Sequence, residues 1–325
     1  MTKHNDAGPL LLSASQVRSR IDPERARSLI EEALLSGFDP MTDPARVVVE
    51  AGSGDGHLLM MPSTLGKWAG VKMASVSPDN PRKGAPRIQA MYLLMDADTL
   101  TPRLILDGTE LTKLRTAATT AVAVDRLAGS GASKLVVFGS GAQAISHVIA
   151  FSKIRGLSEI RLIGRSIERT ASALRQLAAH DILVALGEAG DVADADIVLC
   201  ATTAQEPLFP ADWVKDGTCV AAIGSHRPDQ RELPGSLLAR SQVIVEDRDT
   251  ALREAGDIVL AIQDGDLNPN TLVTIAELVK DEVRRDEQRP NVFKGTGMAW
   301  QDLAIAAGLA QADLLINHEN EAETP

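Results

Sequence analysis

The chain has 325 residues, of which 44% are hydrophobic and 24% charged, a balance typical of a globular protein of about two domains. Its 33 lysines and arginines are outnumbered by 44 aspartates and glutamates, and the formal net charge of -11 argues against nucleic acid or anionic membrane as a partner. No stretch reaches the roughly 18 uninterrupted apolar residues that a membrane span requires, and the first residues lack the apolar core of a secretory signal, so we expect a cytoplasmic protein.

The first part of the chain predicts a helix followed by a series of strands. Asp22 as the N-cap and Pro23 at the first helical position indicate a helix that runs toward Gly37. Short apolar segments separated by turns come next, and each is typical of a strand: ARVVVEAG, HLLMMPS, GVKMASV, QAMYLLMDAD and RLILDG. The glycine-rich SGDG between the first two predicts a hairpin. This half is therefore expected to form a mixed or antiparallel sheet with helices.

The second part of the chain predicts a parallel sheet. An alanine- and valine-rich helix is expected to end near Gly129, and strands then alternate with helices in the order LVVFGSG, AQAISHVIAFSKI, EIRLIGR, SIERTASALRQLAAH, DIVLCAT, CVAAIGS and VIVED. This βαβ series is typical of a doubly wound sheet, and the strand-rich first half is expected to lie outside it. The two cysteines, Cys200 and Cys219, lie in apolar runs and are expected to be core thiols, with no metal bound.

The sequence KLVVFGSGAQAISHV places a glycine-rich turn between an apolar strand and a helix. Gly139 permits a tight turn, Gly141 lets the backbone approach a pyrophosphate, and the small Ala144 lets helix and strand pack closely. The motif therefore predicts a dinucleotide site, with a glycine-rich turn that binds nothing as the alternative. Its predicted cofactor contacts are Gly139, Ser140, Gly141, Ala142, Gln143 and Ala144.

The end of the second strand of this unit decides which dinucleotide is favoured. An acid there would bind the adenosine ribose hydroxyls of NAD(H), but the strand EIRLIGRSIERT ends without one. It carries Arg165, Ser166 and Arg169 instead, and an arginine with a hydroxyl can hold a 2′-phosphate. NADP(H) is thus favoured over NAD(H); the alternative is that Arg165 is an ordinary solvated charge.

No HExxH, CxxC, P-loop or nucleophile elbow occurs, so hydrolytic, metal and kinase chemistry lack support. The first half instead contains three cations on apolar segments: Arg46, Lys72 and Arg115. Each alone is more often a solvated side chain. Lys72 is the most suggestive, because it lies between Val71 and Met73 and a buried lysine usually has an anionic partner.

Several blocks together resemble the ornithine cyclodeaminase and mu-crystallin family from Arg46 to the last helix. They are KMASVSPDNPRKGAP, LTKLRTAATTAVAVDRLA, GSGAQA, ATTAQEPLF, IGSHRPDQREL and FKGTGMAWQDLA. The resemblance implies a homodimer in which residues 1–116 and 304–325 form a mixed-sheet substrate and dimerisation domain. It also implies an inserted Rossmann domain at residues 117–303 and active sites between the domains.

The resemblance also assigns site residues by motif. Arg46, Lys72 and Arg115 match carboxylate-binding cations, and Lys72 is counted with the catalytic residues as well. Thr116 and the GSGAQA loop match cofactor contacts, while Thr202 and Thr203 match a strand end that faces the dinucleotide.

Two departures from the cyclodeaminases within this family favour net oxidoreduction. Cyclodeaminases carry a catalytic aspartate directly after a Gly-Gly pair, where this chain has Gly224, Ser225 and His226. Their second Rossmann strand ends in an acid that selects NAD, where this chain has Gly164 and Arg165. The segment SHRPDQREL resembles the ketimine reductase and crystallin branch of the family more closely than the cyclodeaminases. The family is functionally mixed, so its fold does not determine the reaction.

The expected reaction is reduction of a small cyclic imine carboxylate of the Δ1-pyrroline-2-carboxylate or Δ1-piperideine-2-carboxylate type, or a related amino-acid dehydrogenation. The cations would hold the carboxylate, and His226 is the candidate proton donor because imidazole ordinarily titrates near neutrality. Asp229 is the second candidate, and a structural role for His226 is the alternative. Ornithine-type cyclodeamination and cofactor-dependent binding without catalysis remain open.

Overall fold

The computed structural model describes residues 8–51 and 56–322, and the chain divides into two compact units. The first unit combines the described parts of Met1–Ala33, Thr42–Arg115 and Met298–Pro325. The second combines Leu34–Met41 with Thr116–Gly297. These units are defined by their internal contacts; the functional domain limits of 1–116 with 304–325, and of 117–303, stay a prediction.

Within the described residues, the first unit contains a six-stranded sheet in the order β1-β6-β5-β4-β3-β2. Only the pair β1 and β6 runs parallel, so the expected mixed sheet is confirmed. β2 and β3 pair antiparallel as a hairpin requires, although most of the predicted SGDG turn lies outside the described residues. The strands are β1 (Leu10–Leu12), β2 (Val47–Glu50), β3 (His57–Leu65), β4 (Trp68–Val76), β5 (Ile88–Asp96) and β6 (Pro102–Asp107).

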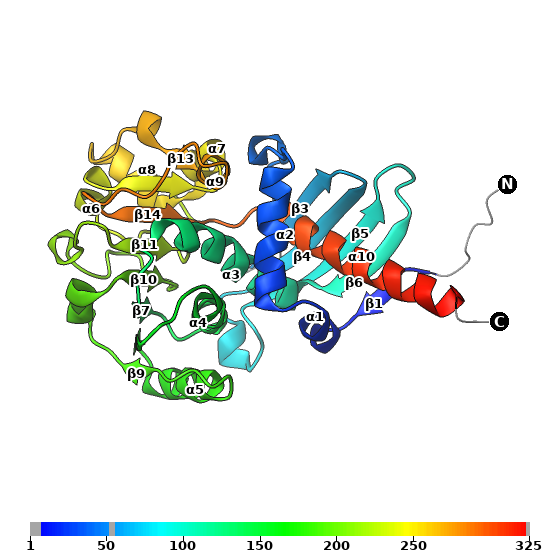
Figure 1. Cartoon of the computed structure of the whole chain (residues 1–325), viewed down its shortest axis with the longest axis horizontal. Coiled ribbons are helices and arrows are strands. Elements are labelled where there is room, and N and C mark those ends of the chain that lie inside the picture. Colours follow the sequence, from blue (N-terminus) through cyan, green and yellow to red (C-terminus); the bar gives the residue numbers. More distant parts are fainter. Residues whose placement is uncertain (1–7, 52–55, 323–325) are drawn as a thin grey trace. The chain divides into compact units, whose positions relative to one another are not determined.

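Helices α1 (Ala14–Arg20) and α10 (Ala299–Ala322) pack on this sheet. α10 runs along β3, β4 and β5, as Figure 1 shows. α2 (Pro23–Leu35) begins as predicted, because the backbone N–H of Arg25 donates to the Asp22 carboxylate at 2.7 Å.

The two faces of this sheet differ in burial. Because side chains alternate along a strand, one cross-strand row faces α10 and is buried: Met61, Lys72, Tyr92 and Leu106. The neighbouring row on the opposite face is exposed and apolar: Val47, Met60, Met73 and Met91. The strand pattern therefore places a lysine in the core and methionines at the surface.

The second unit contains an eight-stranded parallel sheet among the residues that the structure describes, in the order β13-β12-β14-β11-β10-β7-β8-β9. Its strands are β7 (Lys134–Phe138), β8 (Glu159–Ile163), β9 (Ala185–Leu186), β10 (Ile197–Cys200), β11 (Cys219–Ala222), β12 (Gln242–Val245), β13 (Val273–Thr274) and β14 (Asn291–Lys294). From β7 the chain builds outward to β8 and β9, then returns to the other side of β7 with β10. This reversal is the topological switch of a doubly wound fold, and it confirms the predicted Rossmann arrangement.

Helices surround this sheet in Figure 1. They are the long α3 (Gly108–Leu127), whose second half belongs to this unit, together with α4 (Ala142–Ile154), α5 (Ile167–Ala178), α6 (Gly235–Ala239), α7 (Arg248–Glu254), α8 (Gly256–Gln263) and α9 (Ile275–Val279). Cys200 and Cys219 are buried free thiols in adjacent strands, as expected. Burial raises the pKa of Cys219 to about 12, so this thiol is unreactive.

No helix among the described residues is long and apolar enough to cross a membrane. Within the same residues, no group of three or more histidine, cysteine, aspartate or glutamate side chains is placed to hold a metal ion.

Candidate functional site

A buried ion pair lies under α10 in the first unit. Lys72 projects from the inner face of β4, and its Nζ lies 2.7 Å from Oδ2 of Asp302 on the first turn of α10. Only 2% of Lys72 and none of Asp302 is exposed. The anionic partner that a buried lysine requires is therefore Asp302, which lies in the block FKGTGMAWQDLA but is not among the predicted site residues.

Arg115 joins this pair from α3. Its Nε lies 3.5 Å from the other carboxylate oxygen of Asp302, and its NH1 donates to Oε1 of Gln301 at 2.8 Å. Gln301 also accepts from the backbone N–H of Met298, so the start of α10 is fixed to the arginine. Arg46, half-buried just before β2, is close enough to act on Lys72 electrostatically. The three predicted carboxylate-binding cations are thus brought together.

The electrostatics of this cluster favour an incoming anion. The pKa of Lys72 is lowered to about 8, first by burial and then by Arg115, while Asp302 opposes the shift and Arg46 adds to it. Lys72 and Arg115 are both buried and share the carboxylate of Asp302, and an excess of buried positive charge is costly unless an anion accompanies it. A lysine with this pKa can also give up a proton near neutral pH.

Tyr92, the only tyrosine of the chain, closes the inner face beside Lys72. It is buried, and its hydroxyl has no hydrogen-bond partner within the described part of the chain. A Cβ at Gly70 would lie 2.3 Å from that hydroxyl, so the glycine makes the room that Tyr92 occupies. Burial, with the charges of Asp302 and Asp43, raises the pKa of Tyr92 well above its ordinary value.

The glycine-rich turn of the second unit has the geometry of a dinucleotide site. Gly139 has a φ of +115°, and a Cβ there would lie 2.4 Å from the carbonyl oxygen of Ala201. Gly141 is the N-cap of α4 and has no side chain to cap the helix, while a Cβ at this position would meet nothing within 4 Å. The first N–H groups of α4 can therefore donate hydrogen bonds to a phosphate group.

Other features of this turn fit the same group. Ala144 is fully buried where α4 meets the sheet, as the motif predicts. Oε1 of Gln143 is buried without a hydrogen-bond partner among the described residues, so it is available to a hydroxyl donor. The turn follows β7 at the topological switch, where ligands of such sheets bind.

The adjacent strand end has no room for an acid at its first position. A Cβ at Gly164 would lie 2.2 Å from Oγ1 of Thr170, so this position cannot carry a side chain without rearrangement. Arg165 is exposed, and its NH2 lies 3.5 Å from Oγ1 of Thr203 in the loop after β10. The hydroxyl of Ser166 caps α5 by accepting from the backbone of Arg169, whose side chain is exposed.

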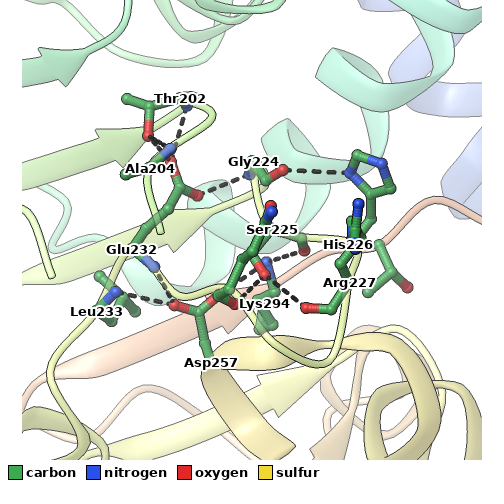
Figure 2. A network of polar contacts seen from close by, with 12 residues as sticks. Thr202, Ala204, Gly224, Ser225, His226, Arg227, Glu232, Leu233, Asp257 and Lys294 are labelled. Atoms are coloured by element: carbon green, nitrogen blue, oxygen red, sulfur yellow. Dashed lines mark hydrogen bonds and ion pairs between the residues drawn. The ribbon is translucent and has the colours of Figure 1, made fainter. Parts of the chain in front are cut away.

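A buried carboxylate connects the ends of β10 and β11 in the same unit (Figure 2). Oε1 of Glu232 accepts from the backbone N–H of Thr202 at 2.8 Å and from its hydroxyl at 2.7 Å. Oε2 accepts from the backbone N–H of Gly224 at 2.7 Å. Burial is the main cause that raises the pKa of Glu232.

His226 and Asp229 lie on the loop that follows β11, and both are exposed. Nδ1 of His226 is 3.3 Å from the carbonyl oxygen of Gly224, and since a carbonyl can only accept, Nδ1 donates in this contact. Asp229 pairs with Arg227 on the same loop at 3.3 Å. Thr116, the residue after Arg115 on α3, is half-buried.

The two sets of site residues belong to different units. The carboxylate-binding set of Arg46, Lys72 and Arg115 is assembled in the first unit, and the predicted cofactor residues and both candidate acids belong to the second. The roles assigned to these residues stay predictions. Asp302, Gln301 and Glu232 are added by the structure; the charge of Lys72 indicates that an acid is needed but not where it lies in the sequence.

Comparison with known proteins gives the family. The family model for ornithine cyclodeaminase/mu-crystallin matches residues 8–311. The chain belongs to this family. The ornithine cyclodeaminase/mu-crystallin resemblance inferred from the sequence blocks is therefore confirmed.

Within the ornithine cyclodeaminase/mu-crystallin family, the chain is similar to proteins with different names. It is 30% identical to the ketimine reductase mu-crystallin of the mouse, Mus musculus, over 92% of this chain and 95% of that protein. The Delta(1)-pyrroline-2-carboxylate reductase of Thermococcus litoralis, solved with NADH and L-proline, matches with a TM-score of 0.88 at 28% identity, over 95% of this chain and 98% of that one. An archaeal alanine dehydrogenase, solved as a dimer with bound NAD, matches with a TM-score of 0.87 at 27% identity, over 95% and 97% of the two chains.

Proposed function

We propose that this protein is an NAD(P)H-dependent oxidoreductase that reduces the C=N bond of a small cyclic imine carboxylate to a cyclic amino acid. The observation that carries the proposal is the buried cluster in which Lys72 and Arg115 share the carboxylate of Asp302, with Arg46 close enough to act on Lys72 electrostatically. A substrate carboxylate would offset the remaining positive charge, and charge-assisted hydrogen bonds of about 1.5 to 3 kcal/mol each would orient it. Relatives named as pyrroline-2-carboxylate and ketimine reductases support the substrate class.

The reaction adds one hydride to the imine carbon and one proton to the nitrogen. A reduced nicotinamide cofactor, whose pyrophosphate the glycine-rich turn would hold, would supply the hydride. Arg115 and Arg46 hold the carboxylate next to the reacting carbon, and Lys72 either adds to this contact or, with a pKa of about 8, supplies the proton. His226, with Asp229 as the alternative, is the candidate donor of the second unit.

The proposal predicts stoichiometric consumption of cofactor. Purified protein mixed with NADPH and Δ1-pyrroline-2-carboxylate should oxidise one NADPH for each proline formed, measured by the loss of nicotinamide absorbance and by amino-acid analysis. A cyclodeaminase returns its hydride to the product and consumes no net cofactor. Proline and ammonia released from ornithine with catalytic NAD would contradict the proposal, and saturable NADPH binding without turnover of any imine or of 2-oxo acid with amine would indicate a binding protein.

We further propose NADP(H) as the preferred cofactor, on this chain's own residues. Position 164 has no room for a ribose-binding acid, and Arg165 and Ser166 follow it. Arg165→Asp should abolish an NADPH preference of about tenfold or more in kcat/KM, because it replaces a cation with an anion at the 2′-phosphate. Arg175→Asp, the same charge change in the last turn of α5, is the control and should keep the preference. Equal kcat/KM for the two cofactors in the unmodified protein would refute the assignment.

The exposed face of the first sheet supports a homodimer. Val47, Met60, Met73 and Met91 form an apolar row across four strands, each more than a third exposed. Contiguous exposed apolar surface is typical of protein interfaces, and the similar archaeal alanine dehydrogenase is a dimer. We propose that a second copy of this chain covers this face, which light scattering would check as a mass twice that of the chain.

A further inference from the structure

The Glu232 carboxylate is the central acceptor of the network in Figure 2. β10 and β11 are adjacent parallel strands, so Thr202 and Gly224 follow them at the same edge of the sheet. One carboxylate accepts from both positions, with two donors on Oε1 and one on Oε2. It thereby fixes the spacing between the two strand ends.

The strand ends approach so closely that position 224 must be a glycine. A Cβ there would lie 2.1 Å from the carbonyl oxygen of Thr202 and 2.6 Å from Oε1 of Glu232. Gly224 in turn begins the loop that carries His226, whose ring contacts the Gly224 carbonyl. The position of that loop is therefore set by the contact between Gly224 and Glu232.

The backbone of Glu232 is held in turn by the buried Asp257. Its own N–H and that of Leu233 donate to Oδ1 of Asp257 at 2.7 and 2.8 Å. Oδ2 of Asp257 lies 3.0 Å from Nζ of Lys294, and the same ammonium donates to the carbonyl of Ser225 at 2.6 Å. Glu232, Asp257 and Lys294 are at most 1% exposed, so these bonds form in a dry environment where geometry is rigid.

We propose that Glu232 is a positioning residue for the reduction, which holds Thr202 and the His226 loop in the arrangement that the nicotinamide end of the cofactor requires. The inference rests on the proposed function. The residues expected to hold the pyrophosphate and adenosine, at 139–144 and 165–169, make none of the described contacts with Glu232. Loss of the carboxylate should therefore lower kcat while cofactor affinity is nearly kept.

Glu232→Gln is the decisive variant. A glutamine offers one acceptor oxygen where the glutamate offers two, so its NH₂ group must face either the N–H of Thr202 or that of Gly224. We expect kcat for the imine to fall by about 10²-fold and the Kd for NADPH to change by less than about threefold. Hydrogen exchange of residues 202–204 and 224 should accelerate, and the protection that NADPH gives these amides should be lost.

Glu277→Gln is the matched control. Glu277 accepts from the N–H and hydroxyl of Thr274, the N-cap of α9, at 2.6 and 2.8 Å, the same kinds of donor, and it also pairs with Arg248. Its loss should lower the melting temperature and leave kcat unchanged. A Glu232→Gln protein whose kcat and local hydrogen exchange match those of Glu277→Gln would overturn the proposal, as would equal losses in kcat and NADPH affinity.

Two further measurements keep the test decisive. If Glu232→Gln does not fold, Thr202→Val removes one of the three donors and should lower kcat by about tenfold at unchanged NADPH affinity, whereas an unchanged kcat would count against Glu232. If the unmodified protein reduces no imine, the proposed function fails by itself. The NADPH-dependent protection of residues 202–204 then still reports on Glu232, and its persistence in Glu232→Gln would overturn the inference.

Discussion

Asp302→Asn should shift the alkaline limb of the pH profile of kcat/KM to lower pH by roughly one to three pH units. The sign follows from the ion pair. Asp302 favours the charged form of Lys72, whose pKa is about 8 with the carboxylate in place. Without it, burial and Arg115 act unopposed, the pKa falls further, and the lysine loses its proton, and its contribution to holding or protonating the substrate, at lower pH. Near pH 8 the rate should fall by about fivefold to 500-fold, and near pH 6 by about tenfold or less.

The double variant Lys72→Met with Asp302→Asn provides the control. It removes the charges of Lys72 and Asp302 together, and Arg115, which loses the carboxylate, keeps its hydrogen bond to Gln301. The substrate imine has the same pKa in the assay of every variant. A difference between the alkaline limbs of two variants is therefore caused by the protein. If Lys72→Met keeps the alkaline limb of the unmodified protein, the limb is not caused by Lys72. If the alkaline limb of folded Asp302→Asn lies at the same pH as that of the unmodified protein, Asp302 does not influence the step that this limb reports.

Gly141→Ala should raise the Kd for NADPH by about 10²-fold without loss of stability. The added Cβ meets nothing within 4 Å in the protein, and the φ of -88° suits any residue, so the melting temperature should stay equal or rise slightly. The methyl group would instead occupy the space through which a pyrophosphate approaches the N-terminus of α4. Titration of nicotinamide fluorescence and thermal unfolding measure the two quantities.

Gly139→Ala distinguishes a binding effect from a folding effect at the same turn. Its Cβ would lie 2.4 Å from the Ala201 carbonyl at a φ of +115°, so we expect a lower melting temperature together with weaker binding. Unchanged NADPH affinity in Gly141→Ala would show that the phosphates do not approach this glycine.

The sequence predicts the elements and the family well because the signals for them are local. The strand-turn-helix around Gly139 and the alternation of strands and helices after it are patterns within a few residues, and the structure confirms them. Long-range partners leave no such pattern. Lys72 and Asp302 are separated by 230 positions, and Thr202 and Glu232 by 30, so only the folded chain pairs them. Burial is also misleading when taken from residue type, since Lys72 is in the core and Met73 at the surface.

The close approach of Gly70 to the Tyr92 hydroxyl limits how this sheet can diverge among descendants of the chain. Any side chain at position 70 would collide with the hydroxyl, so a larger residue there is tolerated only after position 92 has lost its phenol ring or its orientation. The order of the two substitutions is therefore constrained. Lineages that keep a tyrosine at position 92 should keep a glycine at position 70.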